Sequence, residues 1–134
     1  MTDASATTAP YHAHIYFSAA QRPAAAELRE RLLASKSSGL LAGLRFVGEL
    51  RDHKVGPHTI PQFEIHFDKG LLPLVEPQLV ASGLRVLIHP LTLDDLGDHT
   101  HLGRWIGEPV DLDLSVLDPP DVNQSFARFG KTDF

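Results

Sequence analysis

The chain has 134 residues, which is enough for one domain with a hydrophobic core but not comfortably for two. Apolar residues at 43% and charged residues at 22% are typical of a globular protein, and a net charge of −5 with scattered Lys and Arg argues against a nucleic-acid partner. The absence of cysteine excludes disulfides, thiolate metal sites and a cysteine nucleophile, so a metal would have to bind His, Asp or Glu.

Residues 1–10 are predicted to be a disordered lead-in to the first strand. They are rich in Ala, Thr and Ser and lack the basic start and apolar segment of a signal peptide. The chain has no apolar run near 18 residues, so neither a transmembrane helix nor a membrane partner is expected. The cytoplasm is therefore the predicted compartment.

Residues 11–17 alternate between two kinds of side chain, as a half-buried β-strand does. Ala13, Ile15 and Phe17 would form an apolar face, whereas the opposite face would carry His12, His14 and Tyr16. Side chains two residues apart on a strand are about 7 Å apart along it. The two imidazoles would therefore stand side by side, which is the beginning of a metal site.

Two helices and three further strands are predicted between residues 23 and 89. Pro23 suits the first turn of a helix that ends at Ser37-Ser38-Gly39. Residues 44–50 and 62–67 alternate as strands, joined by a loop that contains His58. Residues 71–82 are typical of a helix, although Pro77 is unfavourable in its middle, and residues 84–89 form a fourth strand.

The order of these elements, β-α-β-β-α-β, predicts an α+β, ferredoxin-like fold with an antiparallel sheet and both helices on one face. In this topology the first strand lies between the third and the fourth, so His12 would lie beside His66 and His89. The second face of an antiparallel sheet can stay uncovered. On that face we expect the polar side chains His12, His14, Glu64, His66, Arg85 and His89.

The part after residue 90 is predicted as a helix, an edge strand and a tail. Thr92 would cap the helix, which would place Asp95 beside His99 and His101 beside Trp105. Residues 110–116 alternate again, as an edge strand does. The domain would thus span residues 11–117, and the tail of residues 118–134 contains three phenylalanines that must pack on something or stay mobile.

Histidine is the one enriched chemical signal, since no zinc-protease, phosphate-loop, nucleophile-elbow or EF-hand motif is present. His12 and His14 alone could be solvated, but His66 and His89 on the same face favour a site for Fe, Zn, Cu or Ni. Glu64 could complete a two-His-one-carboxylate site or be a solvated carboxylate. Asp95 could orient His99 as a proton shuttle, or the two could form a surface ion pair.

Five short motifs, in this order, resemble the DOPA 4,5-dioxygenase family of fungi and bacteria over about residues 11–117. The motifs are Tyr11-His12-Ala13-His14-Ile15-Tyr16-Phe17, Val55-Gly56-Pro57-His58, Val86-Leu87-Ile88-His89-Pro90, Asp94-Asp95-Leu96-Gly97-Asp98-His99 with Trp105-Ile106-Gly107, and Leu112-Asp113-Leu114-Ser115. The resemblance implies a ferredoxin-like fold and a non-haem Fe(II) extradiol dioxygenase that cleaves the ring of DOPA or a related catechol with O₂. Fe(II) is the expected metal, with Zn or Ni as alternatives in the isolated protein.

Matching motif by motif carries the family's site to His12, His14, His58, His89 and His99. We expect His14 and His89 to be metal ligands. His12 and His58 would supply a third ligand or an acid/base group, while His99, supported by Asp95, would transfer protons.

Four residues outside the carried-over set are candidate substrate contacts: Arg85 for a substrate carboxylate, together with Glu64, His66 and Trp105. A tryptophan such as Trp105 is more often a core residue than a substrate platform.

Two other functions compete with the dioxygenase. One is a non-enzymatic metal- or small-ligand-binding protein that holds Zn²⁺, and the other is a cofactor-free dimeric α+β enzyme that uses the same sheet face. Since the polar face is too wide to leave bare around a reactive metal, we expect a homodimer in which the partner or the segment 90–108 covers the site.

Overall fold

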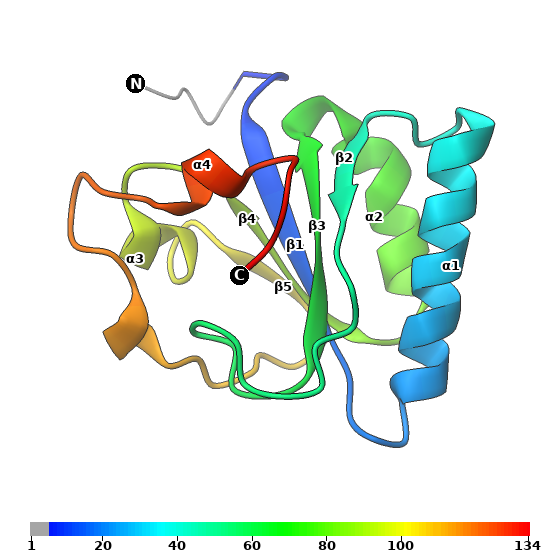
Figure 1. Ribbon diagram of the computed structural model, residues 1–134, viewed down its shortest axis with the longest axis horizontal. Helices are drawn as coiled ribbons and strands as arrows, with labels where there is room; N and C mark the ends of the chain where they lie inside the picture. Colours follow the sequence, from blue (N-terminus) through cyan, green and yellow to red (C-terminus); the bar gives the residue numbers. More distant parts are fainter. Residues whose placement is uncertain (1–5) are drawn as a thin grey trace.

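The computed structural model describes residues 6–134 and contains a five-stranded antiparallel sheet in the order β2-β3-β1-β4-β5 (Figure 1). The strands are β1 (Pro10–Tyr16), β2 (Leu44–Val47), β3 (Gln62–Asp68), β4 (Arg85–Pro90) and β5 (Arg104–Ile106). The helices are α1 (Arg22–Ser38), α2 (Leu72–Ala81), α3 (Asp95–Asp98) and α4 (Ser125–Arg128), with short 3-10 helices η1 (Lys69–Leu71) and η2 (Leu114–Val116).

β1 is the central strand, as the predicted topology requires. It pairs antiparallel with β3 and β4, which places His12 opposite both His66 and His89 and His14 opposite Glu64. The α+β fold and the juxtaposition of these polar side chains, both predicted from alternation and strand order, are confirmed.

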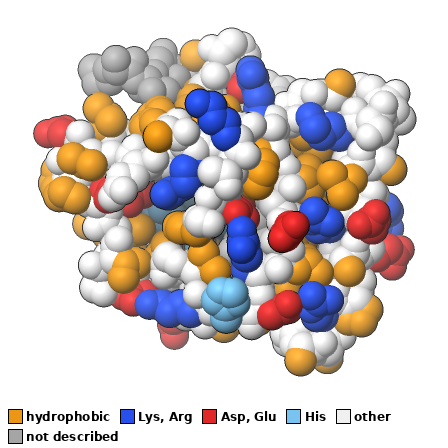
Figure 2. Space-filling view, in the orientation of Figure 1, with side chains coloured by type: hydrophobic (Ala, Val, Ile, Leu, Met, Phe, Trp, Pro, Cys, Tyr) orange, Lys and Arg blue, Asp and Glu red, His pale blue; other side chains and the backbone are white. Residues whose placement is uncertain are grey.

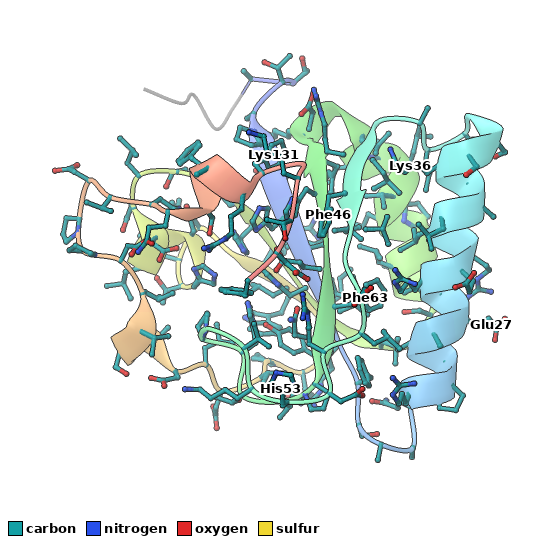
Figure 3. The ribbon with its side chains drawn as sticks, viewed as in Figure 1. Glu27, Lys36, Phe46, His53, Phe63 and Lys131 are labelled. Atoms are coloured by element: carbon teal, nitrogen blue, oxygen red, sulfur yellow. The ribbon has the colours of Figure 1, made fainter. Side chains whose placement is uncertain are left out.

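Both long helices cover one face of the sheet, where the hydrophobic core lies. Figure 1 shows α1 and α2 side by side against that face, and Figure 3 shows Glu27 on the outer side of α1 with Phe63 on the sheet. Leu28 and Leu32 of α1 are fully buried, and burial of such a side chain contributes about 1.5–3 kcal/mol. The predicted core residues are all in this cluster: Ile15, Phe17, Phe63, Ile65, Phe67, Val86 and Ile88.

The predicted edge strand over residues 110–116 is wrong, because β5 at Arg104–Ile106 takes that edge and pairs with β4. Residues 114–116 form η2 instead, and the carboxylate of Asp113 accepts a hydrogen bond from the Ser115 backbone N–H at its start. The alternating polar residues of this segment therefore reflect local turn chemistry, in which Asp competes for backbone donors, rather than a strand.

The helix predicted to start at Thr92 is also much shorter than expected. Asp94, not Thr92, caps α3 by accepting from the Gly97 N–H, and the helix ends at Asp98. Glycine at 97 and 103 disfavours a longer helix, and the chain then turns to join the sheet at β5. His101 and Trp105 are therefore not helical neighbours. β2 likewise ends at Val47 rather than Leu50, after a register irregularity between Leu44 and Phe46.

The lead-in predicted for residues 1–10 lies partly outside the described residues, which begin at residue 6. Within the described part, the backbone carbonyls of Thr7 and Ala9 accept hydrogen bonds from Gly70 and Lys69, both at 2.8 Å. Among the helices of residues 6–134, none is long and apolar enough to cross a membrane.

The polar face of the sheet is buried within the single chain. The cover is largely the tail, a role that was not predicted for it. The tail, residues 118–134, lies over this face through α4 and the residues that follow it, and α3 lies on the same side of the sheet (Figure 1). Figure 2, in the same orientation, shows Lys and Arg side chains spread across the visible face of the molecule, with Asp and Glu among them. His12 and His14 on the polar face are only 4% and 2% exposed. The segment 90–108, expected as the cover, contributes only part of it.

Phe129 is the main apolar contact between the tail and this face. Its ring is nearly parallel to the rings of His12 and His66, with centroids 6.0 and 5.5 Å away. Substituting Phe129→Ala should lower the free energy of unfolding by about 1–3 kcal/mol, less than a fully buried Phe because the residue is half-buried. Urea denaturation measures this. The control is Leu40→Ala, at a side chain 62% exposed, for which a change within about 0.5 kcal/mol is expected. Equal effects of the two substitutions would contradict the docking of the tail.

Candidate metal centre

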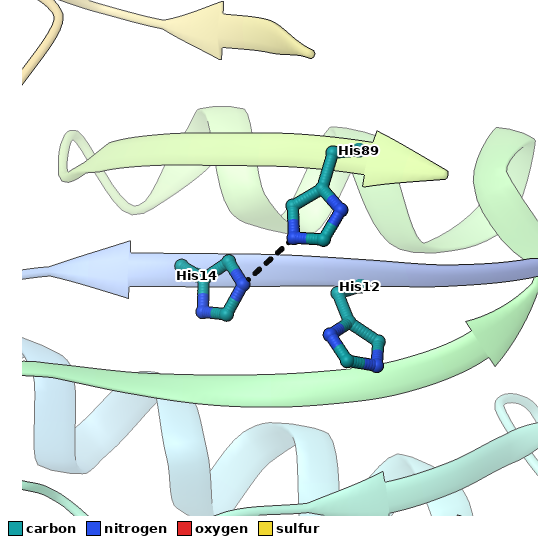
Figure 4. Close-up of side chains that lie close together, drawn as sticks. All are labelled: His12, His14 and His89. Atoms are coloured by element: carbon teal, nitrogen blue, oxygen red, sulfur yellow. Dashed lines mark hydrogen bonds between the residues drawn. The ribbon is translucent and has the colours of Figure 1, made fainter. Parts of the chain in front are cut away.

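Five imidazoles from four separate parts of the chain converge on the polar face of the sheet. His12 and His14 lie on β1 and His89 on β4, and Figure 4 shows their side chains on the same side of these strands. His58 comes from the loop between β2 and β3, and His99 from the end of α3. The side chain of His99 is 8% exposed and the other four residues at most 4%.

The closest pair in this cluster is His14 and His89, whose Nε2 atoms lie 2.9 Å apart (Figure 4). The other nitrogen of each ring faces a carbonyl oxygen: Nδ1 of His89 lies 2.7 Å from the Pro90 backbone oxygen, and Nδ1 of His14 lies 3.2 Å from Gln62 Oε1. With the Gln62 side-chain amide oriented so that Oε1 faces His14, each neutral ring places its one proton on Nδ1 and donates it to the carbonyl.

As a consequence, two Nε2 lone pairs point at each other. This arrangement is unfavourable in a buried site unless a cation lies between or beside the two nitrogens. Two nitrogen ligands bound at 2.0–2.1 Å to one metal ion are about 3 Å apart, which matches the observed separation. A carbonyl acceptor behind each ring is also the usual support of a metal-bound histidine.

His12 extends this pair to a group of three. The ligand atoms of His12, His14 and His89 all lie within 4.8 Å of one another. Nε2 of His12 is fully buried and has no hydrogen-bond partner among the described residues. A buried ring nitrogen without a partner is a site for an unaccounted ligand, and here it lies beside two other free imidazole nitrogens.

A second group of three shares His14 and adds His58 and His99, again within 4.8 Å. His58 Nδ1 lies 2.7 Å from the Tyr16 hydroxyl, and its Nε2 is buried with no partner among residues 6–134. His99 donates from Nδ1 to the backbone oxygen of Asp95 at 2.8 Å, while the Asp95 carboxylate is at 3.4 Å. Asp95 thus orients His99 mainly through its carbonyl rather than through the predicted carboxylate contact.

The backbone around His99 is fixed by Asp98, which is fully buried. Its carboxylate accepts hydrogen bonds from the backbone N–H and the hydroxyl of Thr92, at 2.9 and 2.6 Å. Burial raises the pKa of Asp98 to about 7, although the hydrogen bonds from Thr92 oppose this rise. Asn123 donates to the Thr92 carbonyl at 2.7 Å, which ties the start of the tail to the same segment.

Glu64 and His66 form a separate pair beside His12. The Gly130 backbone N–H donates to His66 Nδ1 at 2.9 Å, so the ring proton is on Nε2, from which it is donated to Glu64 Oε2 at 2.8 Å. Both nitrogens of His66 are therefore engaged, which argues against a metal-ligand role for this residue. The other carboxylate oxygen of Glu64, Oε1, is buried and without a partner in the described chain.

The electrostatics of the cluster keep four of its imidazoles neutral. The pKa values of His12, His14, His58 and His89 are well below the ordinary value, first because burial disfavours the charged ring and then because neighbouring imidazoles would repel it. Neutral imidazole is the form that binds a metal. Burial also raises the pKa of Tyr16, so its phenol stays protonated and available as a hydrogen-bond donor.

Four of the five converging imidazoles, all but His89, border a cavity of about 230 Å³ between the polar face of the sheet and the tail. From the sheet, the loop and α3 it is lined by His12, His14, Glu64, His66, Gly56, Pro57, His58, Asp95 and His99, and from the rest of the chain by Val116, Leu117, Asp118, Gln124, Ser125, Arg128, Thr132 and Phe134. Two candidate substrate contacts are outside this lining. Arg85 lies farther along β4, and Trp105 packs on Tyr16 with ring centroids 5.6 Å apart.

Several residues of the site were given no role from the sequence. Alternation placed Tyr16 on the polar face of β1, and Gln62 continues the same polar period on β3, but neither was assigned a function. The tail residues carry no such signal, because their position depends on long-range packing. The two other histidines of the chain, His53 and His101, are exposed, and Figure 3 shows His53 away from the cluster.

The chain is similar to a small set of known proteins. It is 33% identical over 112 residues to a DOPA 4,5-dioxygenase of Amanita muscaria, covering 80% of this chain and 49% of that protein. It is 34% identical over 76 residues to an uncharacterised 21.2 kDa protein of Botryotinia fuckeliana, covering 49% of this chain and 42% of that one. The chain thus spans about half the length of the curated relatives it matches.

The fold has a counterpart in a crystal structure. A provisionally assigned dioxygenase from Nostoc punctiforme superposes with a TM-score of 0.68 at 32% sequence identity, covering 82% of this chain and 91% of that one. The sequence model of the Dopa 4,5-dioxygenase family matches residues 11–116, and this range includes all five converging histidines. This chain therefore belongs to the Dopa 4,5-dioxygenase family.

Proposed function

We propose that this protein is a non-haem Fe(II) extradiol dioxygenase that cleaves the ring of a catechol with O₂. The observation that carries the proposal is the pair of Nε2 atoms of His14 and His89, which face each other at 2.9 Å within a buried cluster of neutral imidazoles. Membership of a family named for a dioxygenase and the adjoining cavity support the same reaction class.

The proposed ligands are His14, His89 and His12. Each ring offers one nitrogen, and these three nitrogens all lie within 4.8 Å of one another. Imidazole suits iron, zinc and nickel alike. Zn or Ni in the isolated protein would therefore bind to the same three imidazoles. With three protein ligands, a bound Fe(II) would keep open positions at which a catecholate and O₂ could bind side by side.

His58 is the proposed acid/base residue. Its Nε2 has no partner among the described residues and borders the cavity, and its Nδ1 faces the Tyr16 hydroxyl. A neutral His58 whose ring proton is on Nδ1, donated to the Tyr16 oxygen, would accept the catechol proton at Nε2. His99, held by the carbonyl of Asp95, borders the same cavity and would hold or relay a proton.

Glu64 would offset positive charge at the centre. Its Oε2 is held by His66 and its Oε1 is free and buried. A buried carboxylate without a partner on one oxygen is costly, and a divalent cation nearby would lower that cost. His66 would act through Glu64, as a positioning residue.

Assembly and location remain predictions. The expectation of a homodimer depended on a polar face that a single chain would leave bare, yet the tail already covers this face. Sedimentation equilibrium would test for a dimer. A cytoplasmic location likewise stays a prediction.

Turnover of catechols tests the reaction directly. The protein is loaded with Fe(II) under anaerobic conditions, mixed with several catechols and exposed to O₂. A yellow ring-opened semialdehyde is expected, together with uptake of one O₂ per product. A protein that binds zinc tightly but opens no catechol would be a binding module, and turnover that survives complete chelation would indicate a cofactor-free enzyme.

Removal of His14 or His89 should abolish metal binding. Each ring supplies one of the two facing Nε2 atoms, so His14→Ala and His89→Ala are expected to lower metal affinity by more than about 100-fold, beyond the effect of losing a supporting residue. Metal content after loading and gel filtration measures this. His53→Ala, at an exposed histidine, is the matched control and should retain full occupancy. Stoichiometric metal in both cluster variants would refute the assignment.

The metal-free protein should lose stability in mild acid. Because the folded-state pKa values of four histidines are lowered, the unfolded chain binds more protons once the pH falls below about 6.5. The free energy of unfolding then falls with decreasing pH, by up to about 1.4 kcal/mol per pH unit for each histidine. Urea denaturation of the chelated protein between pH 5 and 8 measures the slope. His14→Gln should reduce it, whereas His53→Gln should keep it.

A further inference from the structure

One wall of the cavity is built by residues that lie after the family match, which ends at residue 116. Gln124, Ser125, Arg128, Thr132 and Phe134 of the tail all line it. The imidazole cluster belongs to the matched region, and this wall does not. Tail side chains are therefore placed to contact parts of the substrate beyond the reacting ring.

Arg128 is a half-buried cation in this wall that lacks a carboxylate partner. Its guanidinium donates to the Ser125 hydroxyl at 3.1 Å and lies 5.0 Å from the centre of the Phe134 ring. None of the ion pairs formed among residues 6–134 includes it. Six other arginines do form such pairs: Arg22, Arg29, Arg31, Arg45, Arg51 and Arg104.

Two of the three acidic residues that line the cavity, Asp95 and Asp118, accept hydrogen bonds from within the chain, and the third, Glu64, is held by His66 on one oxygen. Asp118 accepts hydrogen bonds from the backbone N–H and the side-chain amide of Gln124, both at 2.8 Å. Asp95 accepts from the Asp118 N–H at 2.8 Å. The pKa of Asp118 is lowered first by the hydrogen bonds from Gln124 and least by Arg128, which indicates a weak interaction between these two side chains.

The distance from Arg128 to the cluster fits a small substrate. The Phe134 ring lies 6.1 Å from the His58 ring, and the guanidinium carbon lies 5.0 Å from the Phe134 ring. Because these two separations add to 11.1 Å, Arg128 is no farther than that from the proposed acid/base residue. A catechol with a carboxylate on a two-carbon chain spans roughly 8 Å from its hydroxyls to the carboxylate, by ordinary bond lengths.

We propose that Arg128 binds a carboxylate of the substrate, so that the tail selects catechols with an acidic side chain over neutral ones. The proposal rests on the proposed function for its reaction, but the residue and the ligand chemistry come from the cavity wall. A guanidinium presents two parallel N–H donors that match the two oxygens of a carboxylate. The Phe134 ring and the Ser125 hydroxyl hold the guanidinium in place. Arg85, the residue first considered for this role, is outside the cavity lining.

Paired substrates test this assignment. The Fe(II)-loaded protein is assayed with 3-(3,4-dihydroxyphenyl)propanoate and with 4-ethylcatechol, which has the same ring and lacks the carboxylate. The wild type should prefer the acid. Arg128→Gln should lower kcat/KM for the acid roughly 10- to 100-fold, the range for a charge-assisted hydrogen bond, and leave the neutral catechol within about twofold.

Two further variants make the comparison decisive. Lys131→Gln removes a cation from the same tail at an exposed position outside the cavity lining (Figure 3), and it should leave the preference unchanged. Arg128→Lys keeps the charge and should retain a clear preference for the acid. If Arg128→Gln folds poorly, this variant still tests whether a cation at position 128 sets the preference. Equal losses for both substrates in Arg128→Gln would mean that Arg128 only holds the tail, and would overturn the proposal.

A binding measurement separates this proposal from the proposed reaction. 3-Phenylpropanoate, which has the carboxylate but no hydroxyls, is titrated calorimetrically into the metal-free wild type and Arg128→Gln. Weaker binding to the variant by roughly 10-fold or more supports the carboxylate site even if no catechol is cleaved. Equal affinity of the two proteins overturns it even if catechols are cleaved.

Discussion

The period of two along β1 is the constraint on which the rest of the structure depends. β1 is the central strand, so one of its faces must supply the core and the other must lie beneath whatever covers the sheet. Ala13 and Ile15 are fully buried against the helices, and this fixes His12 and His14 on the opposite side. A one-residue shift of the register of β1 would turn both of its imidazoles into the core. The hydrophobic packing of α1 and α2 therefore positions the candidate metal ligands as firmly as any direct contact.

The antiparallel pairing on both sides of β1 explains why histidines distant in the sequence meet. β3 and β4 bring His66 and His89 to the same level as His12, and the Pro90 carbonyl that orients His89 is part of the same strand end. Two residues outside the strands, His58 and His99, complete the cluster. His58 follows a tight turn in which Val55 and His58 hydrogen-bond to each other, and His99 follows the short helix α3.

Most of the sheet and its helices could be predicted, because period and strand order are local or nearly local properties. The same reasoning placed four of the six histidines on this face, His12, His14, His66 and His89, together with Glu64, whereas His58 and His99 came from the family resemblance. It failed where short-range chemistry imitates a strand, as between Asp111 and Ser115, and where glycine ended α3 early. It also had no means to place the tail. Phe129 stacks on His12, and the Gly130 N–H donates a hydrogen bond to His66, which lies 64 positions earlier in the chain. No sequence period encodes contacts between residues so far apart.

The tail converts an exposed polar face into a buried one, and this changes the energetics of the site. Buried imidazoles with lone pairs opposed or without partners destabilise the metal-free fold, since each polar atom has lost its water. A metal that binds only the folded chain would reverse this cost, so its binding energy would appear directly as stability. The tail thus couples three properties. By excluding water it keeps the imidazoles neutral, it raises the cost of the empty cluster, and it presents Arg128 at the cavity wall. Closure of the site, metal affinity and substrate choice would then depend on one segment that the family match does not include.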